Sequence, residues 1–509
     1  MILTVDLGTT LTKVVLWERD GPVARAGIPV RTVHPAPGWA EQAPSEWWSS
    51  VVAACAQLRA HAGRRFGPVE AVGCTGARQT FVPVDAGGRP LGPAIVWSDR
   101  RAALEATTLA DAMGGAEPAF DRTGVPLDAG SVAAKIAWLA DHDRQRLAAS
   151  AWLLAPRDLI AWRLTGEVVT DATMASRTGL YDVDGRMVGE LAGLAATSLP
   201  PIVPSDQVSG RLLPEAASVL GLEVGTPVVI GAGDRPCEVL GAGAGEVCPM
   251  VSWGTTANVS LPLGDGPPVR PRGMVLSRAA GGGWLVEGGL SSAGSFVEWL
   301  GRLTGHRPTE LSELARRSPP GARGVTATPW LDGARAPWWR PDAGAAFVGL
   351  SSDHGVADLA RALFESVGWE VKRCLDAMDA RRPEGPPAGA LALGGAGAAV
   401  AVWVESLTGI TGLAGTRRRS GQAASAGAAL LAASAVGADF TLEEMDPVDE
   451  QLEPDPVAVS HYAGLQPRAE RVVSAMIDLA PASSPVPAGR PPPSAAQTPS
   501  SDTRGPSCD

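Results

Sequence analysis

The chain has 509 residues, of which 45% are hydrophobic and 19% charged, a balance typical of a globular protein with more than one core. Its formal net charge of −11 argues against a nucleic-acid partner, because the field of an acidic protein repels nucleic-acid phosphates. The six cysteines are far apart and form no CxxC pair, so the sequence predicts neither a disulfide framework nor a zinc site.

The first residues are apolar and show no basic segment or cleavage site of a signal peptide. No run of about 20 apolar residues occurs, as a membrane-spanning helix would need. We therefore expect a cytoplasmic protein with no membrane partner.

A strand–turn–strand pattern opens the chain. Residues 2–5 form a short, mostly apolar run, Asp6 follows it, and a Gly-Thr-Thr turn leads into residues 12–17, which are rich in Val and Leu. A similar unit recurs where residues 250–253 lead into Gly254-Thr255-Thr256 and a further apolar run. Two matches this short leave duplication and coincidence open, but with the rest of the chain they favour two similar domains facing each other.

Between and after these units, strands alternate with helices, which predicts an α/β protein with mixed sheets. The predicted strands are 69–74, 81–84, 228–230 and 391–393, the last leading into an Ala-rich helix. The predicted helices are 44–63, with Ser45 as a candidate cap, and 131–142, 156–164 and 356–378. We place a domain boundary in the Gly-rich stretch 241–245. Residues 481–509 are rich in Pro and Ser and are predicted to be disordered.

Asp6 is a candidate metal ligand, because a carboxylate beside a turn with free amides and hydroxyls can hold a hydrated Mg²⁺ together with a phosphate. Lys13 is close enough in sequence to add a positive charge. The alternative is a hairpin turn with Lys13 on a solvated face, and these residues alone favour that alternative.

Two further turns are candidates for nucleotide binding. Gly254 and Thr255 could form the opposite wall of a phosphate site. Gly394 and Gly395 lie at a strand-to-helix turn, where the backbone can approach a nucleotide and a helix N-terminus can face it. Glycines at such turns often serve backbone geometry alone.

Asp234 ends an apolar strand among small residues that leave room for a ligand. It could accept the proton of a sugar hydroxyl that attacks a γ-phosphate. It could equally be the N-cap of the following helix, and the residues themselves leave both readings open.

Taken together, these stretches resemble the FGGY family of carbohydrate kinases, especially its xylulokinase-like members. The resemblance runs from residue 1 to about 440. The residues that carry it are 6–10, 37–42, 47–48, 94–101, 164–167, 170–171, 231–234, 253–256, 333–338, 347–350 and 361–365.

The resemblance implies an α/β fold of two actin/hexokinase-like (ribonuclease H-like) domains, with a nucleotide cleft between them. The expected domains are 1–244 for sugar and phosphate binding and 245–440 for nucleotide binding. Residues 441–480 are expected to form an extension packed on the second domain, before the tail.

The resemblance also implies that the protein phosphorylates a small sugar or polyol, with ATP and Mg²⁺ as cofactors. It makes Asp234 the catalytic base and Asp6 the carboxylate associated with the metal. The residues it places at the nucleotide are Gly8, Thr9, Thr10, Lys13, Gly254, Thr255, Gly294, Glu298, Gly394 and Gly395. A homodimer is one assembly that the sequence leaves open.

Three departures from the family concern the sugar site. Xylulokinases carry Ser-Gly-Gln-Met-His-Gly where this chain has residues 75–80, and its Arg78-Gln79-Thr80 is closer to the Arg-Glu-Thr of glycerol kinases. Arg235 follows the base in place of Asn or Gln, and Ser131 replaces a frequent aromatic. The expected sugar-binding residues are Arg78, Gln79, Asp234 and Arg235.

Three functions follow from this reading. A pentulose such as D-xylulose is the first expected substrate, and glycerol, erythritol or another polyol or ketose is the alternative. A non-catalytic, actin-like ATP-binding protein is the third, but such a protein has no need of a base at Asp234. For Arg235, an inward position at the sugar and an outward pairing with a surface acid both stay open.

Overall fold

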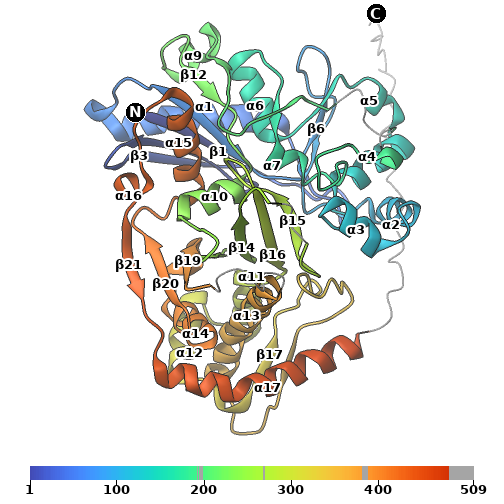
Figure 1. Cartoon of the computed structure of the whole chain (residues 1–509), viewed down its shortest axis with the longest axis vertical. Coiled ribbons are helices and arrows are strands. Elements are labelled where there is room, and N and C mark those ends of the chain that lie inside the picture. Colours follow the sequence, from blue (N-terminus) through green and yellow to red (C-terminus); the bar gives the residue numbers. More distant parts are fainter. Residues whose placement is uncertain (192, 194–198, 267–269, 381–387, 481–509) are drawn as a thin grey trace, which may run out of the picture.

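A computed structural model of the chain describes residues 1–191, 193, 199–266, 270–380 and 388–480. These residues form two α/β halves, which lie one above the other in Figure 1, each around one large sheet. Both sheets mix parallel and antiparallel pairs, so the predicted α/β class with mixed sheets is confirmed. The predicted tail, 481–509, lies outside the described residues.

The first sheet shows why residues 2–5 are mostly apolar, with the hydroxyl of the one polar residue, Thr4, buried and hydrogen-bonded to Ser425. β1 (Ile2–Leu7) lies in its interior, antiparallel to β2 (Leu11–Glu18) and parallel to β5 (Ala71–Gly76). One face of β1 packs on α1 (Pro44–Ala62) and α6 (Pro156–Thr165), and the other on α15 (Ala423–Val436). A strand covered on both faces needs apolar residues on both. The outer strands are β3 (Gly21–Pro29) on one side and β12 (Pro227–Val229) and β11 (Val208–Arg211) on the other.

The second sheet repeats this arrangement. Its order is β15 (Val275–Arg278), β16 (Trp284–Leu290), β14 (Ala257–Leu263), β13 (Met250–Trp253), β19 (Ala390–Gly394), β20 (Ala414–Arg418) and β21 (Val448–Leu452). From β16 to β21, the order and strand directions match those from β3 to β11. The two Gly-Thr-Thr turns occupy equivalent places, between β1 and β2 and between β13 and β14. The shared topology of the two sheets therefore favours duplication of one domain over coincidence.

The predicted helices are present, with one correction at a terminus. They are α1, α4 (Val132–His142), α6 and α13 (Val356–Asp379). Ser45 as the cap of α1 is wrong, because the helix begins at Pro44 and its N-cap is Ala43. Proline suits the first helical position, where its missing N–H would have no helical partner. The Ala-rich segment after Gly395 is split into a short 3₁₀ turn (Ala396–Ala399) and α14 (Ala401–Thr411).

A helix from late in the chain lies on the first sheet and holds the two halves together. α15 packs on β1, β5 and β12, and it also contacts α10 (Asp234–Ala242) closely. A Cβ added at Gly427 would lie 2.0 Å from the carbonyl oxygen of Cys237, and one at Gly241 would lie 1.9 Å from that of Ala423. Only glycines permit this approach of two helix backbones. The contact fixes the start of α10, where Asp234 lies.

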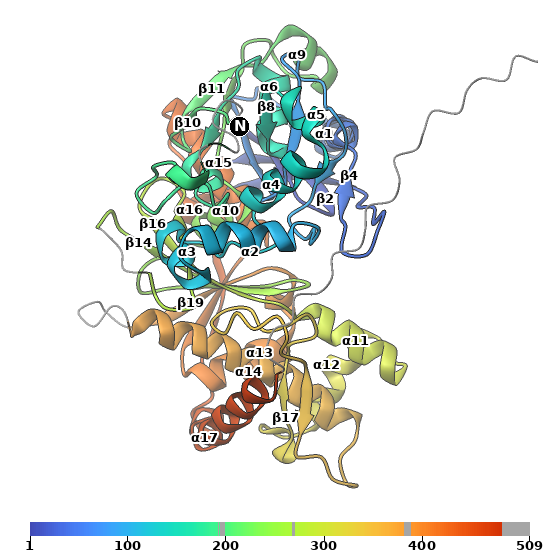
Figure 2. The ribbon, with the colours of Figure 1, turned by 90° about the vertical axis from the view of Figure 1, so that its right-hand side faces the viewer.

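The last described elements contact both halves. α16 (Leu442–Met445) touches α15 and β3, β21 pairs with β20, and α17 (Pro456–Leu479) packs on α14 and β17 (Thr326–Thr328). Figure 2 shows α13, α14 and α17 together in the lower half. Within the described ranges, no helix combines the length and the apolar character needed to cross a membrane.

Candidate active site

A cavity of about 760 Å³ opens between the two halves. Its lining combines the β1–β2 turn, the start of α10 and the end of β19, which are far apart in the sequence. Eight of the residues predicted for the site line it: Asp6, Gly8, Thr10, Lys13, Asp234, Arg235, Gly394 and Gly395. The strands of both sheets therefore bring these residues to one cleft.

Asp6 lies opposite Lys13 in the β1–β2 hairpin, with 3.7 Å between Oδ2 and Nζ. Its other oxygen, Oδ1, is buried and has no hydrogen-bond partner among the described residues. Burial raises the pKa of Asp6 to about 6; Lys13 opposes this shift, while Asp234 and Glu238 add to it. A buried carboxylate oxygen without a donor, close to two other acids, is suited to contact a cation.

The carboxylate oxygens of Asp6 fit a Mg²⁺ ion that is bound partly through phosphate oxygens. Within the part of the chain that the structure describes, no three His, Cys, Asp or Glu side chains form a group that could hold a metal ion by themselves. Magnesium in phosphoryl-transfer sites usually takes one or two carboxylates and completes its shell with water and phosphate oxygens. Asp6 can supply one such contact.

The two Gly-Thr-Thr turns make different contacts with the rest of the chain. Gly8 forms a tight turn, since a Cβ there would lie 2.8 Å from the carbonyl oxygen of Leu11. The hydroxyl of Thr9 accepts a hydrogen bond from Nε1 of Trp97 at 2.9 Å, so its side chain is turned toward Trp97, whereas Thr10 is exposed in the cavity.

The second turn packs on the start of α11 (Gly294–Thr304). The amide of Gly294 donates to the carbonyl of Gly254 at 3.0 Å, and the amide of Ser295 donates to that of Thr255. Glu298 is exposed on α11. The structure thus brings Gly254, Thr255 and Gly294 together, but these three and Glu298 are not among the residues that line the cavity.

Gly395 has a backbone φ of +73°, and a Cβ there would lie 2.2 Å from the carbonyl oxygen of Trp253. Both the left-handed conformation and the close approach require glycine. The following segment is a four-residue 3₁₀ turn, so the expected helix N-terminus directly after Gly395 is absent from this described stretch. Gly394 and Gly395 therefore contribute backbone to the cavity wall, which is buried at Gly394 and exposed at Gly395.

Asp234 is the first residue of α10, and the cap of this helix is Gly233. Asp234 is thus not the N-cap that the alternative reading made it. Its Oδ1 accepts the amide of Arg235 at 2.7 Å and lies 3.7 Å from Nε of Arg78. The side chain remains 44% exposed toward the cleft. Desolvation raises the pKa of Asp234, and Arg78 and Arg235 oppose this shift.

Arg235 pairs with Glu238 one turn further along α10, and both line the cavity. Glu238 also accepts the hydroxyl of Ser252 on β13 at 2.6 Å. Through Glu238, these contacts connect α10 to the second sheet. Of the two positions left open for Arg235, the structure shows pairing with an acid, although this acid lies in the cleft wall and not on the outer surface.

Arg78 spans the two halves. From the loop after β5 it donates two hydrogen bonds to Glu287 on β16, Nη1 to Oε2 at 3.0 Å and Nη2 to Oε1 at 2.5 Å. Ser277 on β15 donates to the same carboxylate at 2.8 Å. Burial alone would raise the pKa of Glu287, but Arg78 and Arg177 lower it to about 2. Glu287 is therefore ionised at neutral pH.

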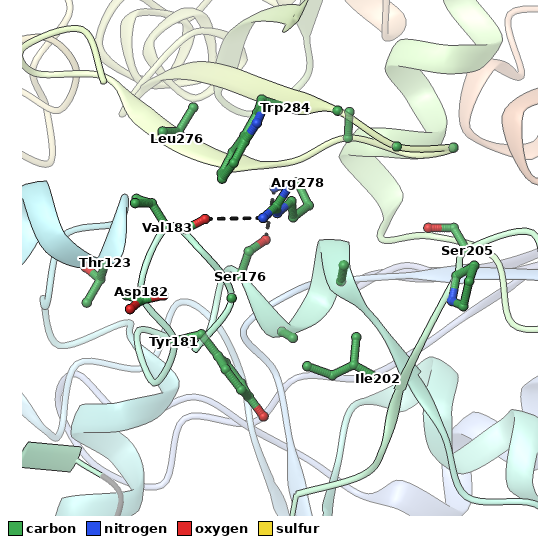
Figure 3. A pocket seen from close by; sticks show the side chains of 18 of the residues that line it. Thr123, Ser176, Tyr181, Asp182, Val183, Ile202, Ser205, Leu276, Arg278 and Trp284 are labelled. Atoms are coloured by element: carbon green, nitrogen blue, oxygen red, sulfur yellow. Dashed lines mark hydrogen bonds between the residues drawn. The ribbon is translucent and has the colours of Figure 1, made fainter. Parts of the chain in front are cut away.

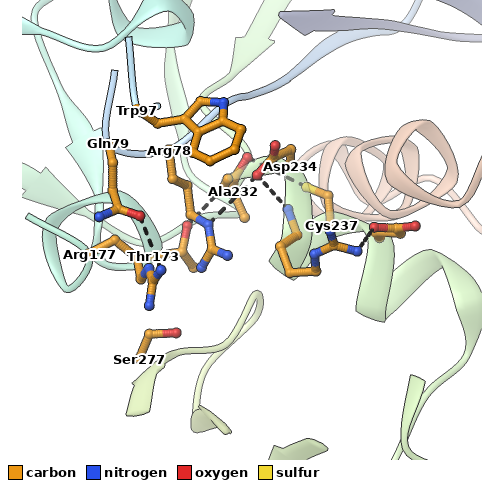
Figure 4. Close-up of polar contacts among 12 residues, drawn as sticks. Arg78, Gln79, Trp97, Thr173, Arg177, Ala232, Asp234, Cys237 and Ser277 are labelled. Carbon is orange, nitrogen blue, oxygen red and sulfur yellow. Dashed lines mark hydrogen bonds and ion pairs between the residues drawn. The ribbon is translucent and has the colours of Figure 1, made fainter. Parts of the chain in front are cut away.

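Gln79 accepts hydrogen bonds from an arginine, as Figure 4 shows, and from a lysine. Its side-chain oxygen accepts Nη2 of Arg177 at 3.1 Å, and its carbonyl accepts Nζ of Lys135 at 3.2 Å. Its φ of +61° is unusual for a residue with a side chain and fixes an uncommon loop conformation. Ser131, at the position where relatives often have an aromatic, caps α4 by accepting the amide of Ala134.

The sequence reasoning missed Glu287, Arg177 and Arg335 as site residues. Glu287 had a usable signal, because it is a single acid in the otherwise apolar strand 284–290. Arg335 lies within one of the stretches that carry the family resemblance, although no role was assigned to it. Arg177 had no such signal, since it lies in a run of small and polar residues.

A second cavity, of about 340 Å³, also lies between segments of the two halves (Figure 3). Its wall contains Ser176, Val183, Arg278 and Trp284. The guanidinium of Arg278 lies 3.7 Å from the ring centroid of Trp284 and donates to the carbonyl of Val183. None of the residues predicted for the site lines this cavity.

Known proteins match nearly the whole described chain. The model of the N-terminal domain of the FGGY family of carbohydrate kinases matches residues 1–241, and that of the C-terminal domain matches residues 250–436. A xylulose kinase of Escherichia coli is 31% identical over 483 residues, 92% of this chain and 97% of that protein. A glycerol kinase of Cereibacter sphaeroides is 34% identical over 398 residues, 74% of this chain and 79% of that protein.

A solved structure agrees with these matches. The crystal structure of xylulose kinase from Rhodospirillum rubrum is 27% identical to the chain and superposes with a TM-score of 0.84. The match covers 93% of this chain and 98% of that one. The expected two-domain, actin/hexokinase-like fold is thereby confirmed.

Proposed function

The chain belongs to the FGGY family of carbohydrate kinases, and we propose that it transfers the γ-phosphate of ATP to a hydroxyl of a small sugar. The observation that carries the proposal is the position of Asp234. This carboxylate lines the cavity together with Asp6 and Gly8, and it also lies 3.7 Å from Arg78, one of the expected sugar-binding residues. One acid thus faces both the phosphate side and the sugar side of the site.

In this mechanism, Asp234 accepts the proton of the attacking hydroxyl. Its raised pKa makes the carboxylate a better base than an ordinary aspartate, while the nearby arginines favour its ionised form. Closure of the cleft over both substrates would exclude water, which would otherwise compete with the sugar for the phosphoryl group.

The phosphates of ATP would lie against the β1–β2 turn, with Lys13 supplying positive charge. The backbone of Gly394 and Gly395 would lie beside the nucleotide. Mg²⁺ would be held through Asp6 and, when bound, would neutralise charge on the phosphate oxygens. We assign sugar and phosphate binding to residues 1–244, and nucleotide binding to residues 245–440.

A pentulose of the D-xylulose type is the first candidate among neutral substrates, supported by the xylulose kinases among the relatives. Glycerol or another polyol is the second. It is favoured by Arg78 and Gln79, which stand where glycerol kinases have Arg and Glu, and by the glycerol kinases among the relatives.

The test is ADP release by the purified protein with ATP and Mg²⁺, measured with D-xylulose, glycerol and erythritol. We expect release that depends on the sugar, and a higher kcat/KM for D-xylulose than for glycerol. Absence of ADP release with every sugar and polyol tested, while ATP binding is retained, would overturn the kinase assignment.

A further inference from the structure

Arg235 lies on the phosphate side of the base. It lines the same cavity as the β1–β2 turn and the two glycines at the end of β19, whereas Arg78 and Gln79 do not line this cavity. Asp234 connects the two sides, because it lines the cavity and lies 3.7 Å from Arg78. Arg235 directly follows this base, and its amide donates to Oδ1 of Asp234 at 2.7 Å.

The guanidinium of Arg235 is held at one nitrogen. Nη1 donates to Oε2 of Glu238, and the other oxygen of Glu238 accepts the hydroxyl of Ser252 at 2.6 Å. Within the described part of the chain, no hydrogen bond engages Nε or Nη2, and the side chain is 23% exposed. The pair with Glu238 therefore fixes the guanidinium in the cavity wall and leaves two of its nitrogens available to a ligand.

The cavity is acidic beside the β1–β2 turn. Asp6, Asp234 and Glu238 line it, and they lie close enough together that Asp234 and Glu238 raise the pKa of Asp6. The triphosphate of ATP would bring further negative charge to this place, and charges of one sign repel. Lys13, 3.7 Å from Asp6, is the cation of the turn itself. Arg235 adds a second cation to the same wall.

Three further arginines line the cavity between the end of β20 and the start of α15: Arg417, Arg418 and Arg419. Arg417 and Arg418 pair with acids of β21 and α16, and Arg418 also donates Nε to the carbonyl of Ala242 at 3.0 Å. Ala242 is the last residue of α10, about 12 Å along the helix from its start at a rise of about 1.5 Å per residue. Arg235, in the first turn of α10, is therefore the arginine of this wall that adjoins the base.

The geometry of phosphoryl transfer gives this position a meaning. The attacking and leaving oxygens lie roughly in line with the γ-phosphorus, so the phosphoryl group moves between the sugar hydroxyl and ADP. Under the proposed function, the hydroxyl is at Asp234 and the phosphates of ATP lie against the β1–β2 turn. The transferred group then passes the start of α10. Its oxygens are negatively charged, and guanidinium donors suit them.

We propose that Arg235 is a further catalytic residue, which donates hydrogen bonds from Nε and Nη2 to the oxygens of the transferred phosphoryl group. The inference rests on the proposed function and replaces the sugar contact that the sequence led us to expect for Arg235. Glu238 is then a positioning residue, which holds Nη1.

The transfer itself balances without any change in Arg235. The hydroxyl oxygen bonds to the γ-phosphorus of ATP as the bond from that phosphorus to the ADP oxygen breaks, and the bonding electron pair leaves with ADP. The hydroxyl proton passes to Asp234. Arg235 stays protonated throughout and stabilises the charge on the phosphoryl oxygens.

The first test is turnover of R235Q with the best sugar among D-xylulose, glycerol and erythritol. Gln keeps a donor for Glu238 and is one of the residues that relatives carry here. We expect kcat to fall about 10²- to 10³-fold, the loss typical when one donor to a transition-state oxyanion is removed. The KM for the sugar should change by less than about threefold. A kcat within threefold of the unmodified chain overturns the inference, and a raised KM with unchanged kcat would place Arg235 at the sugar.

Binding gives a readout that does not depend on turnover. Calorimetry compares ADP with Mg²⁺ to ADP with Mg²⁺ and aluminium fluoride, which takes the place of the transferred phosphoryl group. We expect R235Q to bind ADP within about threefold of the unmodified chain. Its affinity for the aluminium fluoride complex should fall about 10- to 100-fold, since hydrogen bonds to charged groups are worth about 1.5–3 kcal/mol. An equal loss for ADP alone would place Arg235 at the other phosphates and overturn the inference.

A double variant separates contact from charge balance, because R235Q also leaves Glu238 without its cation. In R235Q/E238Q that uncompensated acid is gone, but the donors to the phosphoryl group are still missing. We expect kcat to stay at least about 10-fold below that of the unmodified chain. Recovery to within threefold would mean that Arg235 only neutralises Glu238, and the inference fails.

The matched control is R307Q, which removes an ion pair of the same i,i+3 spacing, with Glu310 on α12 (Pro308–Arg317). It should turn over normally. If R307Q loses as much turnover as R235Q does, the loss comes from opening a helix ion pair and not from the phosphoryl contact.

These measurements separate the inference from the proposed function. Sugar-dependent ADP release that is equal in R235Q and the unmodified chain leaves the kinase intact and removes the phosphoryl contact. Binding of the aluminium fluoride complex that depends on Arg235, without ADP release from any sugar, supports the contact and removes the kinase. If aluminium fluoride does not tighten ADP binding to the unmodified chain, turnover decides, and absence of turnover as well overturns both. If R235Q fails to fold, as judged by circular dichroism, R235K is measured in its place. It keeps the charge without the planar fork, so we expect a loss in kcat of at least about 10-fold, and a loss below threefold overturns the inference.

Discussion

Arg78 and Glu287 form a bidentate ion pair that joins the two halves of the molecule, with N–O distances of 3.0 and 2.5 Å. The side chains of Arg78 and Glu287 are 9% and 3% exposed. Arg78 stands where xylulokinases carry Met, so this pair accompanies a departure from that pattern. It positions Arg78 beside Asp234 and simultaneously holds β16 against the loop that follows β5.

We predict that E287Q destabilises the protein strongly, because it removes the bidentate partner of the buried Arg78 and the ion-pair partner of the buried Arg177. Loss of one partner of a buried pair typically costs about 3–5 kcal/mol. Urea denaturation monitored by circular dichroism measures the effect. The double variant R78M/E287M should be less destabilised than E287Q, since apolar side chains of similar size can replace a buried pair. A double variant less stable than E287Q would contradict this account of the pair.

We predict that D234N abolishes sugar-dependent ADP release while leaving ATP binding intact. The change keeps the shape of the side chain and removes the proton acceptor, and a general base typically contributes about 10²- to 10⁴-fold. Stopped assays measure turnover, and calorimetry measures ATP binding. D184N, which makes the same change at an exposed aspartate paired with Arg186, is the control and should turn over normally. Turnover in D234N within threefold of the unmodified chain would rule out Asp234 as the base.

Much of the fold could be predicted because its signals are local. The apolar runs at 2–5 and 228–230, the turn glycines and the helical spacing of 356–378 are each contained in a few consecutive residues. The position of α15 on the first sheet could not be predicted in this way. Its Ala-rich sequence predicts a helix but carries no information about which sheet covers it, and that choice depends on the contact between Gly427 and the backbone of α10.

For the site, too, local signals could be predicted from the sequence and long-range contacts could not. Asp6 lies one residue before the end of β1 and Asp234 begins the helix that follows β12, so both could be predicted from their position near a strand end. The partners of Arg78 and Arg235 could not, because Glu287 is 209 residues from Arg78 and Glu238 has no distinguishing neighbour in sequence. The meeting of Arg78 and Arg177 at Glu287 depends on the three-dimensional placement of residues from separate segments.

We predict that G427A lowers both stability and turnover, because the added Cβ would lie 2.0 Å from the carbonyl oxygen of Cys237 and would push α15 away from α10. Since α10 begins at Asp234, the shift should also displace the base. The control is G464A in α17, where no atom lies within 4 Å of the added Cβ. That change should stabilise the protein by up to about 1 kcal/mol, as expected for Gly to Ala in a helix. Equal melting temperatures for the two variants would contradict the close contact.

The last prediction concerns the pH dependence that Asp6 confers on stability. Burial raises the pKa of Asp6 from its ordinary value of 3.8 to about 6 in the folded chain. Between these two values the folded state binds more protons than the unfolded state, so the contribution of Asp6 to stability rises as the pH falls from about 7 to about 4. Above pH 7 the ionised carboxylate is a net cost to folding. D6N removes that cost, and we expect its melting temperature at pH 8 to exceed that of the unmodified chain by a few degrees, with the gap shrinking toward pH 4. The measurement is differential scanning calorimetry of both proteins across this range, without nucleotide or metal. D6N should at the same time lose sugar-dependent turnover, because the carboxylate proposed to contact Mg²⁺ is gone. A lower melting temperature of D6N at pH 8 would mean that the pairing with Lys13 outweighs the burial of the charge, and that Asp6 stabilises the hairpin.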